Sequence, residues 1–572
     1  MLEQLHGSII YKDKEIDKIQ LSNIKNKVIS LLMGRITRES VIGIALSRSP
    51  DMIATILAAI DMKVPFVPFD TDTPPERREQ IVREARIDIV VTTHSIKAEW
   101  KVKKCIFLDD DPVPLNASLK NTVPDSDIMY ILFTSGSTGI PKGVEVTRAG
   151  FINFVEGISE VIDFKPGKRI ACLTPVSFDI FFLESIIALY KGLVVVLGSE
   201  EEQRNPKLMA KLIYDNNVNM IQMTPSRIQL LLNYDSKLSC LKKVREIMVG
   251  GEPFPPRLLK ILQQNTMAKI YNMYGPTETT IWSTVSDLTT KERIDIGYPL
   301  LNTSIYIMDE CLQIVPDGQV GEICIAGKGL AKGYVGREQL TSEKFIQLSQ
   351  LNGIRIYRTG DLGRYLQDGS LAHLGRKDNQ IKLRGHRIEL EEVEAHLNQI
   401  IGIYQSAVIA VEEHDTDKVL MAFYKSDDAL KVYDIREYLK LKLPEYMIPT
   451  DYIRVKDFIL TSNGKIDRKR LMECERLETD GAIYSKHDLC KLSEIQIKVL
   501  DIIVSNLNKE VTKEISLEED IIKLGFDSIS FINVVVAIEN EFSLEFEDDK
   551  LLISSFSSIK SILEYVENRY VR

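Results

Sequence analysis

Cysteine is scarce and scattered in this chain of 572 residues. The seven cysteines are odd in number, and no two of them form a C-x-x-C pair. The sequence therefore predicts neither a disulfide framework nor a structural zinc site. A reducing compartment, the cytoplasm, is the expected location.

The chain also lacks a long uncharged apolar run and an excess of basic residues. Charge interrupts the first 14 residues too early for a secretory signal, and the longest apolar stretch, 186–197, contains Lys191. We therefore expect neither export nor a membrane span. The net charge of −10 argues against a nucleic-acid partner. Residues 491–572 hold 16 acidic and 9 basic residues, about −7 of that charge, which predicts a separate acidic module.

What is present indicates several folded domains. A hydrophobic fraction of 44% over this length is ample for two or more cores. Between residues 40 and 370, β-branched runs alternate with helix-like segments, which is typical of an α/β domain with largely parallel sheets. The expected strands are 41–46, 87–91, 170–173, 193–197 and 243–248, and the clearest helices are 51–60 and 206–216.

After residue 377 the sequence pattern changes twice, first to an α+β pattern and then to a helical one. Two strands, 406–411 and 419–424, and a helix at 429–441 predict a small α+β domain. Helical periodicity in 492–509, 528–542 and 555–569 then predicts a bundle of three or four helices. The predicted boundaries are 1–377, 378–475, a linker at 476–490, and 491–572.

The most informative local feature is the stretch 130–144, where an apolar strand-like run is followed by a loop rich in hydroxyl side chains and glycines. Glycines let a backbone approach an anion, hydroxyls add neutral donors, and a lysine adds charge. The loop residues are Thr134, Ser135, Gly136, Ser137, Thr138, Gly139 and Lys142. This is not a Walker loop, because Pro141 precedes the lysine and Gly143 follows it. A polyphosphate cradle and a solvated surface turn are both compatible with the loop alone.

Four further motifs follow in order: 272–282 (NMYGPTETTIW), 357–362 (YRTGDL), Gly375-Arg376 and 463–467 (NGKID). With them, residues 40–471 resemble the amino-acid-activating adenylation domains of nonribosomal peptide synthetases, which are adenylate-forming enzymes. Residues 491–572 resemble the peptidyl carrier domain that follows such modules. The resemblance implies a large α/β N-terminal adenylation subdomain, a small α+β C-terminal subdomain and an all-α helical-bundle carrier domain.

The resemblance also implies roles around ATP and Mg²⁺. The loop at 134–142 would hold the β- and γ-phosphates, Thr277 would donate to phosphate, and Glu278 would bind the metal. Catalysis would use Lys465, which reaches the substrate carboxylate and the α-phosphate. The remaining nucleotide contacts implied are Gly250, Gly251, Glu252, Asn272, Tyr274, Gly275, Asp361 and Arg376.

Each of these residues has a plainer interpretation in isolation. Asp361 could belong to an Asx turn, Glu278 to a helix start, and Lys465 to a solvated hairpin. Tyr274 could be an ordinary core aromatic. The ordered combination of motifs favours the adenylating interpretation.

The resemblance extends to the amino-acid pocket. Asp179 matches the acid that pairs with a substrate α-ammonium, and a buried acid in an apolar run needs such a partner. The other implied lining residues are Ile180, Leu183, Gln222, Met248, Gly250, Met273, Ile281 and Trp282. Trp282 and Met273 would leave little room beyond the α-carbon, so glycine is the favoured substrate and alanine its natural competitor.

The resemblance finally implies where the activated group goes. Ser528, in Leu524-Gly-Phe-Asp-Ser-Ile529, would carry 4′-phosphopantetheine, and it also opens a periodic helix whose free N–H groups suit a phosphodiester. A simple N-cap serine is the plainer alternative. Thioester formation needs the thiol where Lys465 stands during adenylation, so the C-terminal subdomain would rotate about Asp378. The 382–387 loop, including Gly385, would then face the pantetheine tunnel.

Taken together, the expected activity is ATP-dependent activation of a small amino acid and its transfer to the carrier thiol, for nonribosomal peptide or other secondary-metabolite synthesis. An acyl-CoA synthetase-like ligase is the alternative, and Asp179 and Ser528 argue against it. A non-enzymatic scaffold would be expected to lack several of these groups. The expected partners are a phosphopantetheinyl transferase and condensation or tailoring enzymes on other chains, with no nucleic acid or membrane.

Overall fold

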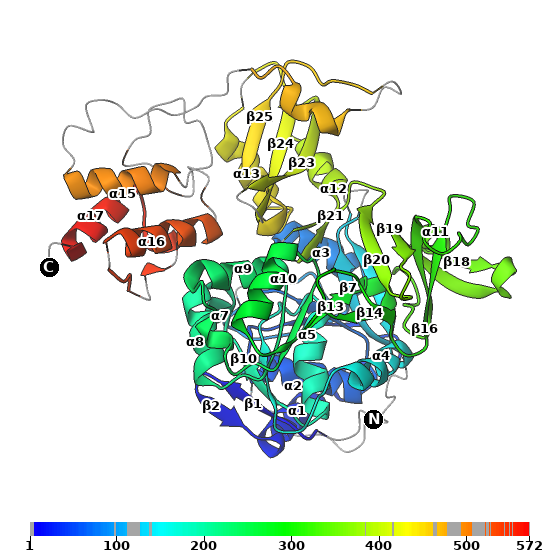
Figure 1. The fold of residues 1–572 in the computed structure, drawn as a ribbon. Coiled ribbons are helices and arrows are strands. Elements are labelled where there is room, and N and C mark those ends of the chain that lie inside the picture. The colour runs from blue at the N-terminus through cyan, green and yellow to red at the C-terminus, as the bar shows by residue number, and fades with distance from the viewer. Residues whose placement is uncertain are drawn as a thin grey trace. The chain divides into compact units, whose positions relative to one another are not determined.

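The computed structural model describes most of the chain (Figure 1). The described residues are 5–96, 99–110, 126–136, 140–383, 385–413, 417–428, 430–461, 466–477, 493–505, 517, 521, 526, 528–542, 544–547, 550–551 and 553–570. They form two compact units. The first unit contains residues 1–395 with 412–418 and 440–447, and the second contains 396–411, 419–439 and 448–572.

The first unit is built around a nine-stranded sheet whose six inner strands are parallel, as the alternating pattern predicts. Its order is β15 (Tyr298–Pro299), β14 (Thr284–Asp287), β13 (Lys269–Tyr274), β12 (Glu246–Gly250), β11 (Met220–Met223), β9 (Arg169–Cys172), β10 (Val194–Leu197), β1 (Ser8–Tyr11) and β2 (Lys14–Ile16). The edge strands β2, β14 and β15 are antiparallel. One face is covered by α8 (Pro206–Asp215), α9 (Pro225–Tyr234) and α10 (Pro256–Asn265), after the short α7 (Glu200–Arg204).

A six-stranded sheet carries the phosphate-loop motif. Its order is β6 (Lys104–Phe107), β5 (Ile89–Thr92), β3 (Ile42–Ala45), β4 (Phe66–Phe69), β7 (Ile128–Thr134) and β8 (Lys142–Thr147). The strands are parallel except for the antiparallel pair β7 and β8. Helix α3 (Pro75–Glu84) packs its apolar side on this sheet.

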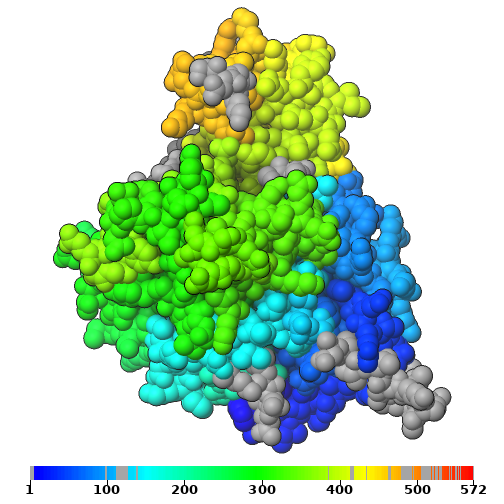
Figure 2. Space-filling view, turned by 90° about the vertical axis from the view of Figure 1, so that its right-hand side faces the viewer, coloured from blue at the N-terminus to red at the C-terminus, as the bar shows by residue number. Residues whose placement is uncertain are grey.

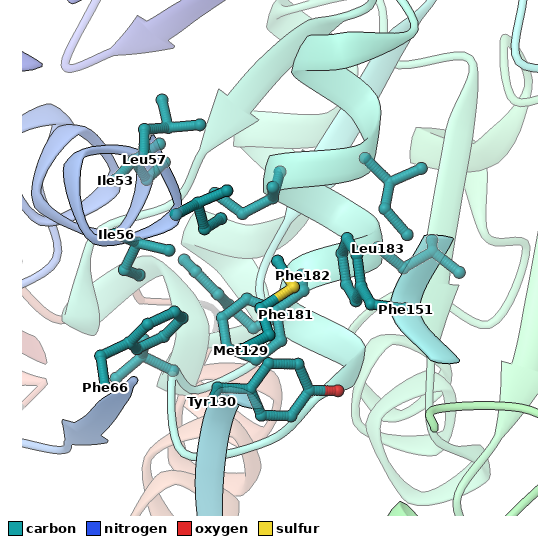
Figure 3. Close-up of a cluster of buried hydrophobic side chains, with 14 of the residues drawn as sticks. Ile53, Ile56, Leu57, Phe66, Met129, Tyr130, Phe151, Phe181, Phe182 and Leu183 are labelled. Carbon is teal, nitrogen blue, oxygen red and sulfur yellow. The ribbon is translucent and has the colours of Figure 1, made fainter. Parts of the chain in front are cut away.

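The largest core joins the two sheets. It contains side chains from α1 (Lys18–Leu32), α2 (Pro50–Asp61), α4 (Arg148–Val161) and the helical run α5 (Ile180–Phe182), η1 (Leu183–Ile187) and α6 (Ala188–Tyr190). Aromatic rings gather at its centre, where Tyr130 and Phe182 lie 4.5 Å apart between centroids (Figure 3). The short N-terminal region is integrated as well, since β1 pairs with β10 and α1 begins with a capping box at Asp17. Figure 2 shows the blue, cyan and green segments adjoining on one face of this unit.

A third sheet differs from the expectation of largely parallel strands. It contains β16 (Thr303–Met308), β17 (Gly321–Gly327), β19 (Ile354–Tyr365), β18 (Phe345–Leu348) and β20 (Leu371–Arg376), and every pair is antiparallel. Short connections allow antiparallel pairing, whereas parallel pairing needs a crossover of a dozen or more residues. The unit also holds α11 (Glu338–Lys344), the hairpin β21 (Ile381–Leu383) and β22 (His386–Ile388), and most of α12 (Leu390–Leu397).

The second unit contains the small α+β part and the carrier region. Strands β23 (Gln405–Glu413), β24 (Asp417–Lys425) and β25 (Asp451–Arg454) form one sheet, with α13 (Val432–Lys440) near the predicted position. The carrier region has α15 (Glu494–Ser505), α16 (Ser528–Phe542) and α17 (Ile559–Tyr570) around one apolar core. These elements confirm the predicted fold class, and the domain boundaries given above stay predictions.

None of the helices in the described part of the chain is both long and apolar enough to cross a bilayer.

Candidate active site

The phosphate-loop motif lies at the end of the six-stranded sheet. Strand β7 ends at Thr134, which pairs across β8 with Lys142. Ser135 and Lys142 are 2% and 5% exposed, so the two ends of the loop are not solvated. A Cβ at Gly136 would lie 2.2 Å from the carbonyl oxygen of Ile140, which explains the glycine. Residues 137–139 lie outside the described residues.

Beside this loop lies a buried cluster of opposite charges. Glu278, in the short helix η3 (Thr277–Thr279), is fully buried. Its carboxylate accepts hydrogen bonds from the Tyr334 hydroxyl at 2.8 Å and from Nη1 of Arg387 at 2.9 and 3.0 Å. The Lys142 Nζ lies 4.0 Å from the same carboxylate and 5.4 Å from the Tyr334 ring centre.

The two sides of this cluster have shifted pKa values. Burial alone would raise the pKa of Glu278, but the charges of Arg387 and Lys142 lower it to about 2. Burial, and then repulsion from Arg387, lowers the pKa of Lys142 to about 8. Glu278 is therefore ionised at neutral pH, and Lys142 is close to its titration range.

A second cluster surrounds Asp361. The residue lies inside β19, not in the Asx turn that was the plainer alternative. Its carboxylate accepts from the Tyr274 hydroxyl at 2.6 Å and from Nη1 of Arg376 at 3.0 Å, and His373 Nε2 lies 3.4 Å away. Burial acts to raise the pKa of Asp361, but the His373 hydrogen bond and the Arg376 charge hold it below its ordinary value. An ionised carboxylate between donors suits a diol such as a ribose.

Asp179 lies in the wall of the candidate amino-acid pocket. It is 6% exposed and accepts a hydrogen bond from the backbone N–H of Ile281 at 3.3 Å. Burial raises its pKa to about 6. Lys382 interacts with it electrostatically, but among the described residues no direct ion pair is formed. A buried carboxyl group that makes no direct ion pair is suited to an ammonium group from a ligand.

Backbone strain supports this geometry. Thr280 and Ile281 have φ values of 65° and 64°, in the left-handed region that β-branched residues rarely adopt. The unusual turn directs the Ile281 N–H at Asp179 and carries Trp282 into the core. Such outliers persist only where the surrounding structure holds them, and they concentrate at functional sites.

The remaining pocket residues are closely packed. A Cβ added to Gly250 would lie 2.6 Å from Trp282 Cη2 and 2.7 Å from the Met273 carbonyl oxygen. The other lining residues, Ile180, Leu183, Met248 and Ile281, are buried. Both amide atoms of Gln222 and the indole nitrogen of Trp282 are buried without a hydrogen-bond partner among the described residues.

Other predicted site residues have identifiable structural contacts. Asn272 donates its side-chain amide to the Asp295 carbonyl oxygen at 2.8 Å. A Cβ at Gly275 would lie 2.7 Å from the backbone of Trp282, and Gly251 has a φ of 86°. Arg376 joins Asp361 to the predicted hinge residue Asp378, whose oxygens it contacts at 2.6 and 2.8 Å.

The segment 385–392 contacts the candidate site, and its residues beyond Arg387 were not assigned by the motif analysis. Glu252 accepts from the Ser226 hydroxyl at 2.6 Å and from the backbone N–H of Gly385. His386 stacks on Tyr446 with ring centres 3.5 Å apart. Arg387 in turn contacts Glu278, so these contacts bring the 382–387 loop to the candidate site. The sequence signal that could have pointed to Glu389 and Glu392 is the charge alternation in Arg387-Ile-Glu389-Leu-Glu-Glu392.

Two predicted site residues are not fully described by the structure. Lys465 lies outside the described residues. Ser528 is the first residue of α16, as the periodicity predicts, and its side chain is outside the described part.

The donor set fits a magnesium ion bound mainly through phosphate. Among the described residues no group of three or more His, Cys, Asp or Glu side chains could form a metal cage. A single ionised carboxylate, Glu278, beside an anion-binding loop matches the usual pairing of Mg²⁺ with one carboxylate and substrate phosphates. In this arrangement Arg387 contacts both oxygens of that carboxylate.

Comparison with protein families defines the class. Residues 17–335 match the family described as AMP-binding enzyme, and residues 498–566 match the phosphopantetheine attachment site. The first match covers more than half of the chain, so the chain belongs to the AMP-binding enzymes. Within that class it is an adenylation domain of the nonribosomal peptide synthetase type, fused to a carrier domain.

Curated relatives support the assignment to the nonribosomal peptide synthetase type. The chain is 36% identical to a dimodular nonribosomal peptide synthase of Bacillus subtilis over 477 residues, 81% of this chain and 20% of that protein. It is 31% identical to tyrocidine synthase 2 of Brevibacillus parabrevis over 561 residues, 97% of this chain and 15% of that protein. The chain therefore spans a fifth or less of the length of these relatives.

Solved structures agree on the fold. A four-domain nonribosomal peptide synthetase bound to AMP and glycine matches with a TM-score of 0.61 and 29% identity, over 99% of this chain and 42% of that one. A protein with adenylation and carrier domains, bound to a vinylsulfonamide inhibitor, matches with a TM-score of 0.80 and 23% identity, over 99% and 94% of the two chains.

Proposed function

We propose that this chain activates a small amino acid, with glycine favoured, as its aminoacyl-AMP and then transfers the aminoacyl group to a phosphopantetheine thiol on Ser528. The observation that carries the proposal is the position of Asp179. It is a buried carboxyl group that makes no direct ion pair among the described residues, and it lies in the chain segment that precedes the pocket residues Ile180 and Leu183.

In the first half-reaction the substrate carboxylate oxygen attacks the α-phosphorus of ATP. The bond from that phosphorus to the bridging oxygen breaks, and pyrophosphate leaves. Lys142 and the backbone at Gly136 would bind the leaving phosphates, and Asp361 would bind the ribose hydroxyls. Magnesium held at Glu278 would supply charge neutralisation, and Lys465 would counter the charge on the reacting oxygens.

In the second half-reaction the pantetheine thiolate attacks the aminoacyl carbonyl carbon, and AMP leaves. Gly385 and Arg387 contact Glu252 and Glu278, which supports a role for the 382–387 loop at the site in this half-reaction. Rotation about Asp378 is the proposed route between the arrangements for the two half-reactions.

Glycine is favoured over alanine by steric exclusion. A Cβ at Gly250 would clash with Trp282, so the bulky indole packs directly on the Gly250 backbone, and this supports a small substrate. The glycine bound to the four-domain relative, at 29% identity, points the same way. Alanine remains the competing substrate, and an acyl-CoA synthetase-like reaction would not require Asp179 or the carrier region.

The carrier region implies a phosphopantetheinyl transferase as a partner. Peptide-bond formation and release would then use condensation or tailoring enzymes on other chains. The cysteines that the structure describes are free thiols, which supports a cytoplasmic location.

ATP–pyrophosphate exchange across all amino acids tests the proposal. We expect the highest kcat/KM with glycine and a lower value with alanine. Faster exchange with a large or charged amino acid would contradict the substrate assignment.

A further inference from the structure

Two carboxylates of the protein occupy the anion-binding side of the phosphate loop. The backbone N–H of Gly136 donates to Oε2 of Glu392 at 2.9 Å. The Lys142 Nζ lies 3.7 Å from Oε1 of Glu389. Both glutamates belong to the segment that enters α12, 256 residues from Gly136 in the case of Glu392.

The contact between Glu392 and Gly136 belongs to a buried, fully paired arrangement. Glu392 is fully buried, and its other oxygen binds Nη1 of Arg77 at 2.7 Å, where the arginine side chain is itself 6% exposed. A buried carboxylate is stable only when it is paired and hydrogen-bonded, and here Arg77 and Gly136 meet both needs.

Two further hydrogen bonds align the phosphate loop with residues 387–389. Ser135 Oγ donates to the Arg387 carbonyl oxygen at 2.7 Å and accepts from the Glu389 N–H at 3.2 Å. These two bonds place Glu389 opposite Lys142, while Arg387 reaches Glu278. The Gly136 N–H, Lys142 and Arg387 therefore each have a carboxylate partner from within the protein.

We propose that Glu392 and Glu389 act as an internal substitute for pyrophosphate: in the arrangement seen here they occupy the loop after pyrophosphate leaves and exclude its return. The inference rests on the proposed function, because it requires the loop to bind pyrophosphate during adenylation. The physical basis is competition, since the single Gly136 N–H cannot donate to a protein carboxylate and to a phosphate at once, and the negative charge of Glu389 beside Lys142 repels a second anion.

This competition would let Glu389 and Glu392 oppose the reversal of adenylation. Pyrophosphate attack on the aminoacyl-AMP would re-form ATP and the free amino acid. While Glu392 and Glu389 hold the loop, the aminoacyl-AMP is exposed to the thiol and protected from pyrophosphate. Glu389, Glu392 and Arg77 are thus positioning residues for the second half-reaction, and none of them is required to touch the substrate.

The decisive test compares Glu392→Gln with Glu391→Gln in the full chain, using magnesium pyrophosphate as the probe. Glutamine keeps the size of the side chain and removes the charge. Glu391 carries the same charge on the same helix and contacts Asn379 at 2.9 Å, away from the loop. Removing the charge weakens the hydrogen bonds that Glu392 accepts from Gly136 and Arg77. The KM for pyrophosphate in the exchange reaction should therefore fall about tenfold for Glu392→Gln only.

A second variant separates competition from general electrostatics. Arg77→Gln removes a positive charge, so simple attraction predicts weaker binding of pyrophosphate. It also leaves Glu392 buried without its cation, which destabilises the occupied arrangement. The proposal therefore predicts tighter binding of pyrophosphate, the opposite sign, and weaker binding would overturn it.

Hydrogen exchange supplies a readout that does not depend on activity. Adding magnesium pyrophosphate to the wild-type chain should increase amide exchange in residues 386–395. Pyrophosphate that binds without changing exchange there would overturn the inference while leaving the proposed function intact. A wild-type chain that neither binds pyrophosphate nor catalyses exchange with any amino acid would overturn the proposed function, and this inference with it.

Discussion

Arg387 donates one amino group to both carboxylate oxygens of Glu278, at 2.9 and 3.0 Å. Glu278 is the residue implied as the magnesium ligand, so in this arrangement an arginine side chain neutralises the charge that a metal would neutralise during adenylation. The pair joins segments 109 residues apart; Glu278 is fully buried, and the Arg387 side chain is 15% exposed. Its energetic consequences can be measured.

The first prediction concerns acid stability. The folded-state pKa of Glu278 is lowered from 4.5 to about 2, so its ion pairing stabilises the fold above pH 4.5 and this contribution is lost as the pH falls toward 2. Arg387→Met should destabilise the chain by about 3 kcal/mol near neutral pH, because it removes one partner of a buried pair. The difference from wild type should shrink between pH 4.5 and 2.

Denaturant unfolding at several pH values measures that difference. Arg470→Met is the matched control, because Arg470 pairs with Glu473 on the surface. Its effect should be small at every pH. A difference for Arg387→Met that stays constant down to pH 2 would show that Glu278 is not its partner.

The second prediction concerns the substrate ammonium group. The Asp179 pKa is raised to about 6 by burial, so the carboxylate is ionised above that pH and protonated below it. The KM for glycine in the exchange assay should therefore rise as the pH falls through 6. Asp179→Asn should raise this KM about 100-fold at pH 8 and remove the pH dependence near 6. A variant that keeps the wild-type KM would rule out the ammonium pairing.

The third prediction concerns pocket size. Trp282→Phe removes part of the indole next to Gly250 and should raise the kcat/KM for alanine relative to glycine about tenfold. The second tryptophan of the chain offers the control, because Trp100 packs on Phe69 with ring centres 5.0 Å apart, in a different core cluster. Trp100→Phe should leave the ratio unchanged. An unchanged ratio for Trp282→Phe would place the limiting wall elsewhere.

The fourth prediction separates the two half-reactions. Lys465→Ala should abolish ATP–pyrophosphate exchange while sparing thiolation from chemically prepared aminoacyl-AMP. Lys469→Ala, four residues later and exposed, should affect neither step. Single-turnover assays of each half-reaction give the comparison, and an equal loss of both would count against a role limited to adenylation.

The fifth prediction concerns the carrier region. Incubation with a phosphopantetheinyl transferase and coenzyme A should add one phosphopantetheine mass to the wild-type chain. Ser528→Ala should show no increase, and Ser530→Ala, two residues along α16, should be modified normally. Intact-mass spectrometry is the measurement, and modification of Ser528→Ala would move the attachment site.

Local patterns predicted most elements well. The apolar periodicity of 528–542 matches α16, and the β-branched run at 193–197 matches β10 to within one residue. These succeed because burial of one helix face or of a whole parallel strand leaves a regular spacing in the sequence. The third sheet was described less well, since its antiparallel pairing depends on connections and partners that alternation alone does not reveal.

The sequence by itself determined the chemistry that is available: a hydroxyl- and glycine-rich loop with Lys142, the acid Glu278, the carboxylate Asp361 and the serine that opens α16. Motif order was sufficient to identify the class. Only the tertiary structure decided which charges meet. The contacts of Glu392 with Gly136 and of Arg387 with Glu278 span 256 and 109 residues. Such contacts depend on where packed elements direct their side chains, and short-range periodicity carries no record of that.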